Sequence, residues 1–135
     1  MAVKHPIKLF SKELCNVVKI NADCIDACNY NCEYCYNMKN GHVRTNKILD
    51  LSKLYNFASW ISNRTDKTVL TVLLGGEPTL HPQFLDLCKK TNKNFKLLSF
   101  SNFSKPYEFF EETAKFNVKY LLTFHYADNR VDSFI

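Results

Sequence analysis

Four short runs of apolar and β-branched residues are spaced along the chain, each bounded by polar or turn-forming residues. They cover Val17–Ala22, Thr68–Leu74, Phe95–Phe100 and Val118–Phe124. Runs of this length and composition predict β-strands. The second and fourth are almost continuously apolar, which is typical of parallel strands covered on both faces.

Between the predicted strands, apolar residues recur with the spacing of amphipathic helices. The predicted helices cover Ile48–Ser62, Pro82–Lys90 and Pro106–Phe116. Asp50 or Ser52 would start the first helix, and Ser104 is a candidate cap for the third. Alternating strands and helices indicate βαβ units with right-handed crossovers. We therefore expect an α/β fold with a parallel sheet of about four strands and crossover helices.

Composition adds few constraints on function. The 135 residues suffice for one modest domain, and an apolar fraction of 46% is ordinary for a globular protein. The net charge of +5 comes from scattered lysines and arginines, so no nucleic-acid-binding face is indicated. No apolar run is long enough for a signal peptide or a membrane span. We therefore expect a cytoplasmic protein, in which a tight cysteine cluster binds metal rather than forming disulfides.

The strongest chemical signal is a group of three cysteines directly after the first predicted strand. Cys28, Cys32 and Cys35 have the spacing C-x3-C-x2-C. Three thiolates on one short loop can converge on a metal centre, but closed clusters and structural zinc sites need four ligands. A [4Fe–4S] cluster with one iron not held by protein fits this set. A zinc site completed by Cys24 or His42 fits it equally well, because thiolates suit both metals.

A second motif, Gly75-Gly76-Glu77-Pro78, follows the second predicted strand. Two adjacent glycines let a backbone approach a ligand closely, and the proline stiffens the exit. The Glu77 carboxylate would be able to hold a ligand ammonium group. A glycine-rich turn between strand and helix is the simpler reading. The motif nevertheless contains two of only three glycines in the chain, which favours a specific role.

Taken together, these two motifs resemble those of the radical S-adenosylmethionine (radical SAM) enzymes. The run Cys28-x3-Cys32-x-Tyr34-Cys35 is similar to the cluster motif of that family, including the aromatic residue before the third cysteine. Gly75–Pro78 is similar to the family's GGEP motif after the second strand. The resemblance implies the amino-terminal part of the family's core domain. The fold implied is the first part of a partial (βα)6 TIM-like barrel.

The resemblance also implies roles for these residues. Cys28, Cys32 and Cys35 would hold three irons of a [4Fe–4S] cluster, and S-adenosylmethionine would chelate the fourth. The backbone and side chain around Gly75–Glu77 would receive the methionine ammonium, and Tyr34 would lie near the adenine. Electron transfer from the cluster would cleave the sulfonium and produce a 5′-deoxyadenosyl radical that abstracts hydrogen from a substrate.

Weaker candidates lie at the ends of the later strands. Ser101 and Asn102 follow the third strand and His125 the fourth, where family members use polar residues for cofactor or substrate. Taken alone, serine and asparagine are ordinary turn formers, and His125 would be a surface or packed histidine. His81 is expected at a helix entry. The remaining cysteines are expected to be structural, namely Cys15, Cys24 and Cys88.

We expect a single domain over residues 1–135, with residues 1–16 as an amino-terminal extension. The family core has six βα units and this chain shows four strands, so we expect a shortened core completed by further units or by a partner chain. The substrate, a small molecule or a peptide, is not indicated. An external electron donor such as flavodoxin or ferredoxin is implied by the resemblance. A non-catalytic iron–sulfur or zinc module is the alternative function.

Overall fold

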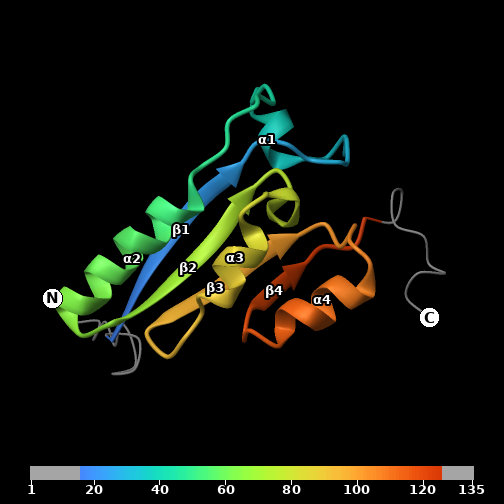
Figure 1. The fold of residues 1–135 in the computed structure, drawn as a ribbon. Helices are drawn as coiled ribbons and strands as arrows, with labels where there is room; N and C mark the ends of the chain where they lie inside the picture. The colour runs from blue at the N-terminus through green and yellow to red at the C-terminus, as the bar shows by residue number, and fades with distance from the viewer. Residues whose placement is uncertain (1–15, 126–135) are drawn as a thin grey trace, which may run out of the picture.

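The computed structural model describes residues 16–125, which form one parallel sheet flanked by helices (Figure 1). The strands are β1 (Val17–Ile25), β2 (Thr68–Gly75), β3 (Phe95–Ser101) and β4 (Lys119–Leu122). The helices are α1 (Tyr36–Lys39), α2 (Leu51–Thr65), α3 (Phe84–Lys89) and α4 (Tyr107–Ala114), with a 3-10 turn, η2 (Pro78–Leu80). The expected α/β fold with four parallel strands is confirmed.

The strands follow one another in space as they do in sequence, in the order β1-β2-β3-β4, and each neighbouring pair is parallel. In Figure 1 all four arrows point the same way, and α1 lies beyond the arrowhead of β1. Right-handed crossovers that always step in the same direction place their helices on one face of the sheet. The carboxyl ends of the strands, with the loops that follow them, therefore lie at one edge.

The core lies between that face of the sheet and the helices. Val69, Thr71 and Leu73 alternate along β2 and are fully buried. Leu51 and Phe84 reach the same cluster from α2 and α3. The alternation places every second side chain of the strand against the helices, as the pleat requires.

The fourth strand differs from its prediction. β4 is shorter than the predicted run Val118–Phe124, and its apolar residues Leu121 and Leu122 are 51% and 44% exposed. The prediction that this strand is covered on both faces is wrong for residues 16–125. β4 pairs with β3 alone in this part of the chain, so it stands at an edge of the sheet.

Helix ends follow sequence chemistry only in part. Asp50 caps α2 as expected, because its side chain accepts from the N–H groups of Ser52 and Lys53. The prediction that Ser104 caps the third predicted helix is wrong. This helix, α4, begins after Pro106, and no side chain caps its first turn. The Ser104 hydroxyl instead donates to Asn29 Oδ1 at 3.3 Å.

Three of the structural residues expected from sequence are found in packed positions. Cys24 and Cys88 are fully buried, and burial raises the pKa of each thiol to about 12. His81 is buried at the entry to α3, where Nε2 donates to the Leu49 carbonyl and Nδ1 accepts from the Gln83 N–H. Cys15 and nearly all of the expected extension lie outside the described residues. Across residues 16–125, no helix is long and apolar enough to cross a membrane.

Phe84→Ala is expected to destabilise this fold strongly. Phe84 is 1% exposed and its ring stacks on Phe109 with centroids 5.9 Å apart, so truncation leaves a cavity. The loss in the free energy of unfolding should be about 3–5 kcal/mol in urea denaturation. Leu85→Ala, on the same helix but 38% exposed, should cost about 1 kcal/mol at most. Equal losses for the two variants would contradict this packing.

Candidate functional site

The predicted site residues meet at the carboxyl edge of the sheet. The loop after β1 contains the three cysteines, the turn after β2 contains Gly76 and Glu77, and β3 ends at Ser101, which Asn102 follows directly. Hydrogen bonds join the first of these segments to the other two, and His125 contacts the cysteine loop from beyond β4. Residues up to 93 positions apart in sequence thus form one cluster.

The cysteine loop has its own local order. A turn closes between the Cys32 carbonyl and the Cys35 N–H, and α1 begins directly after Cys35. The Cys28 thiol accepts from the Tyr30 N–H at 3.5 Å. All three thiols are partly exposed, in contrast to Cys24 and Cys88. The loop therefore presents three accessible sulfur donors at the edge of the sheet.

The two glycines hold this loop against β2. The Gly76 N–H donates to the Ile25 carbonyl at 2.6 Å, and the Glu77 N–H donates to the Ala27 carbonyl at 2.9 Å. A Cβ added at Gly76 would overlap the backbone of Ala27, and one at Gly75 would overlap the Ile25 carbonyl. Gly75 also has φ +118°, a conformation that favours glycine. Both glycines are required because the strand that leads into the cysteines passes directly over them.

Glu77 is fully buried and its side chain is bound by four protein donors. Oε1 accepts from the Thr79 N–H, the Thr79 hydroxyl and the Ser101 hydroxyl, at 3.2, 2.5 and 2.9 Å. Oε2 accepts from the Asn102 N–H at 2.6 Å. A buried carboxylate needs such partners to offset its lost hydration. Glu77 thus ties the turn after β2 to the end of β3.

Asn102 extends the network to the cysteines. Its Nδ2 donates to Asn29 Oδ1 at 3.0 Å and lies 3.6 Å from the Cys28 Sγ. Its Oδ1 accepts from the Ser104 N–H at 3.1 Å. Asn29 is a residue that the sequence did not single out, although its place directly after Cys28 was the available signal.

His125 and Tyr34 cover the second cysteine. His125 Nδ1 lies 2.7 Å from the Tyr34 hydroxyl and 3.4 Å from the Cys32 Sγ. The Tyr34 ring stacks on the imidazole, and the Tyr30 ring meets it edge to face. The segment that follows β4 is therefore brought to the cysteine loop.

A small hollow lies beside the third cysteine. Its lining comprises Asp26, Cys35, Asn37, Met38, His42, Arg44, Gly75 and Gly76. Asp26 accepts from the Thr45 hydroxyl and lies 3.4 Å from His42 Nε2, and the Thr45 hydrogen bond lowers the pKa of its carboxyl. Arg44 donates to the Cys28 carbonyl at 3.4 Å. Sequence reasoning missed Asp26 and Arg44, because only folding brings residues 26 and 44 to the two glycines.

Three partly exposed cysteines are the kind of donor set that an iron–sulfur cluster uses. Among residues 16–125, no three His, Cys, Asp or Glu side chains are placed to hold one ion. Cluster ligands need not converge in that way, because the cysteines are spread over several irons. The two candidate fourth zinc ligands are occupied otherwise: Cys24 is buried with its thiol directed to the Leu74 carbonyl, and His42 pairs with Asp26.

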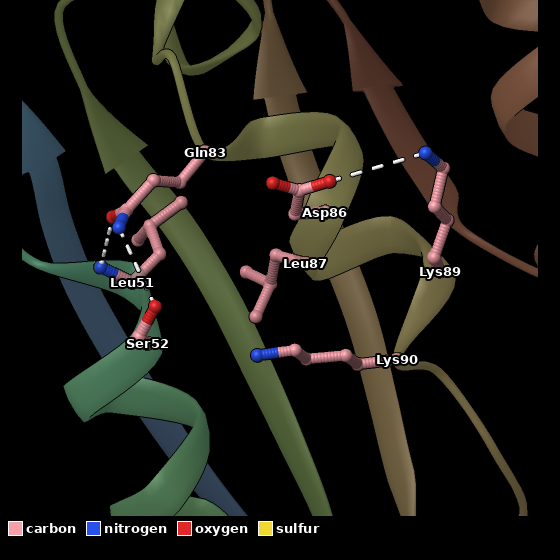
Figure 2. A pocket seen from close by; sticks show the side chains of 7 residues that line it. All are labelled: Leu51, Ser52, Gln83, Asp86, Leu87, Lys89 and Lys90. Carbon is pink, nitrogen blue, oxygen red and sulfur yellow. Dashed lines mark hydrogen bonds and ion pairs between the residues drawn. The ribbon is translucent and has the colours of Figure 1, made fainter.

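A separate pocket lies between α2 and α3 and belongs to the packing of these helices. Figure 2 shows Gln83 reaching the first turn of α2, where Oε1 accepts from the Leu51 N–H at 2.8 Å and Nε2 donates to the Ser52 hydroxyl at 3.4 Å. Asp86 and Lys89 form an ion pair at 3.9 Å on the other side. The residues that line this pocket include none of the predicted site residues.

Comparison with known proteins bears on the family. A family model described as the radical SAM superfamily matches residues 24–134, which is most of the chain. Two similar proteins of Helicobacter pylori, from strains 26695 and J99, are each named UPF0026 protein. They are 37% identical over 87 residues and 36% identical over 89 residues. Each match covers 60% of this chain and 28% of the relative, so the chain spans well under half the length of these relatives.

No solved structure matches the chain. The family model spans the cysteine loop, the GGEP turn and strands β2 to β4, and its match agrees with the resemblance seen in the two motifs. The parallel sheet places both motifs at the same edge. The chain belongs to the radical SAM superfamily.

Proposed function

We propose that this chain binds a [4Fe–4S] cluster through Cys28, Cys32 and Cys35, and S-adenosylmethionine beside it. When bound, the cluster supplies one electron that cleaves S-adenosylmethionine to methionine and a 5′-deoxyadenosyl radical, which abstracts hydrogen from a substrate. The observation that carries the proposal is the pair of hydrogen bonds from Gly76 and Glu77 to the strand entering the cysteine loop. They join the two motifs into one site.

The structure suggests how the chain's residues would divide the binding of S-adenosylmethionine. The Glu77 carboxylate is already bound by four donors, so a ligand ammonium would meet the backbone of Gly75–Glu77 rather than that side chain. The hollow beside Cys35 is lined by the Asp26 carboxylate, which already contacts Thr45 and His42, and by the Arg44 guanidinium. Side chains of both signs suit the amino and carboxylate groups of a methionine.

The remaining predicted residues have supporting roles in this proposal. Pro78 begins η2 and stiffens the turn after Glu77. Ser101 and Asn102 hold the Glu77 carboxylate, and Tyr34 with His125 forms a wall over Cys32. Tyr34 is 47% exposed, so this residue remains accessible to an adenine.

The match covers only 28% of the length of each relative, so a whole protein built on this domain would contain further segments that contribute to its activity. We infer that an external one-electron donor of the flavodoxin or ferredoxin type reduces the cluster. The apolar residues left exposed on β4 would suit further βα units or a partner chain. A non-catalytic metal-binding module is the alternative, and the exposed β4 edge is the observation that favours it.

Iron loading tests the cluster directly. Anaerobic reconstitution should give broad visible absorbance and about four irons per chain. Cys32→Ala should lose the cluster, because one of only three protein ligands is removed. Cys88→Ala, at a fully buried thiol of the core, should keep it. Stoichiometric zinc that iron cannot replace would show that the site is not an iron–sulfur centre.

Gly76→Val should abolish both cluster loading and S-adenosylmethionine binding. The new side chain would overlap the Ala27 backbone and displace the strand that enters the cysteine loop. If Gly76 served only to let a ligand approach the backbone, Gly76→Val would weaken S-adenosylmethionine binding but leave cluster loading intact. Ala114→Val is the matched control, because it introduces the same side chain at an exposed position of α4, away from the cysteine loop. Iron content and equilibrium dialysis with labelled cofactor measure the two effects.

Release of 5′-deoxyadenosine separates the enzyme from the non-catalytic module. The short chain is expected to bind its cofactors but to turn over poorly, because an open site admits water to a radical intermediate. A version extended by further βα units should produce 5′-deoxyadenosine in a substrate-dependent way. Chromatography of reduced reaction mixtures measures the product. A loaded cluster with no cleavage by either version would support the module instead.

A further inference from the structure

The side-chain amide of Asn102 spans the gap between the end of β3 and the cysteine loop. We propose that Asn102 is a positioning residue whose amide donates a hydrogen bond to the Cys28 sulfur and raises the reduction potential of the cluster. The inference rests on the proposed function, since it concerns the cluster that Cys28 would hold. Its evidence is the geometry around this one amide.

The orientation of the amide follows from its neighbours. Oδ1 accepts from the Ser104 N–H at 3.1 Å, and Nδ2 donates to Asn29 Oδ1 at 3.0 Å. If the amide were flipped, its NH2 group would face the Ser104 N–H and its oxygen would face Asn29 Oδ1, and neither pair can form a hydrogen bond. The network therefore directs Nδ2 toward the Cys28 Sγ, which lies 3.6 Å away.

The backbone of Asn102 is held as firmly as its side chain. Its N–H donates to Glu77 Oε2 at 2.6 Å, and the hydroxyl of the preceding Ser101 donates to Oε1 of the same carboxylate at 2.9 Å. Asn102 is 7% exposed and Glu77 is fully buried. The donor is thus positioned before any cluster is present, and in surroundings where a hydrogen bond is electrostatically stronger than in water.

A donor at a ligating sulfur has a definite redox effect. Reduction adds one negative charge to the cluster and its thiolates, and an N–H directed at the sulfur stabilises the more negative state. Hydrogen bonds to the sulfurs are among the features that set the potentials of iron–sulfur centres. Removal of the Asn102 amide should therefore make the cluster harder to reduce.

The experiment is a redox titration of the reconstituted chain, with dithionite and mediators and with the reduced cluster followed by electron paramagnetic resonance. At a fixed potential, Asn102→Ala should lower the ratio of reduced to oxidised cluster about fivefold, as expected for one lost hydrogen bond. Asn102→Asp, which replaces the donor by a carboxylate, should lower it further. Ser104→Ala, which removes a different donor to Asn29, should leave the ratio unchanged.

Equal ratios for the Asn102 variants and the unaltered chain would overturn this inference while leaving the cluster in place. Failure of the unaltered chain to bind any iron–sulfur cluster would overturn the proposed function and the inference with it. If the Asn102 variants do not fold, pulsed electron paramagnetic resonance on the chain with 15N in its asparagine side chains decides. A 15N coupling to the cluster that persists in Asn29→Ala, Asn31→Ala and Asn37→Ala supports the inference, and its absence overturns it.

Discussion

The buried carboxylate of Glu77 is the interaction on which the arrangement of this site depends. A carboxylate without water around it must be surrounded by donors, and here the donors come from two separate segments. Thr79 belongs to the turn after β2, whereas Ser101 is the last residue of β3 and Asn102 follows it. The hydrogen bonds that this one carboxylate requires therefore fix how the two loops lie relative to each other.

A second constraint acts through the backbone beside that carboxylate. Gly75 and Gly76 lie so close to Ile25 and Ala27 that no Cβ can be accommodated. Backbone hydrogen bonds from Gly76 and Glu77 to these two residues hold the segments together. The position of the cysteine loop is consequently set by β2 rather than by the loop itself. In this protein the glycines of the GGEP turn pack against the backbone of residues 25–27. A ligand would contact the part of the turn's backbone that this packing leaves exposed.

The two faces of the sheet have different tasks. One face packs on α2, α3 and α4 and contains the core. On the other face Phe100 of β3 lies beside Leu121 of β4, and both are substantially exposed. Stability thus comes from the helical side, while the candidate site lies at the carboxyl edge of the sheet. This division is common to parallel α/β proteins, since loops at one edge can vary without disturbing the packed layer.

The sequence by itself determined the α/β class and the family, because apolar periodicity and motif spacing are local properties. Val17, Thr68 and Phe95 begin strands where the pattern predicts them. It could not show that β4 is an exposed edge, since a run such as Val118–Phe124 reads the same with or without a neighbour.

Only the tertiary structure decided which residues meet at the site. Asn102 contacts Cys28, 74 positions away in sequence, and His125 contacts Cys32, 93 positions away. Both contacts depend on the register of the sheet and on the geometry of the crossovers. The same holds for Glu77, whose sequence context suggested a ligand for an ammonium group and whose partners prove to be hydroxyl and N–H donors of the protein. A motif specifies which groups are available, but the satisfaction of buried polar atoms decides where each of them points.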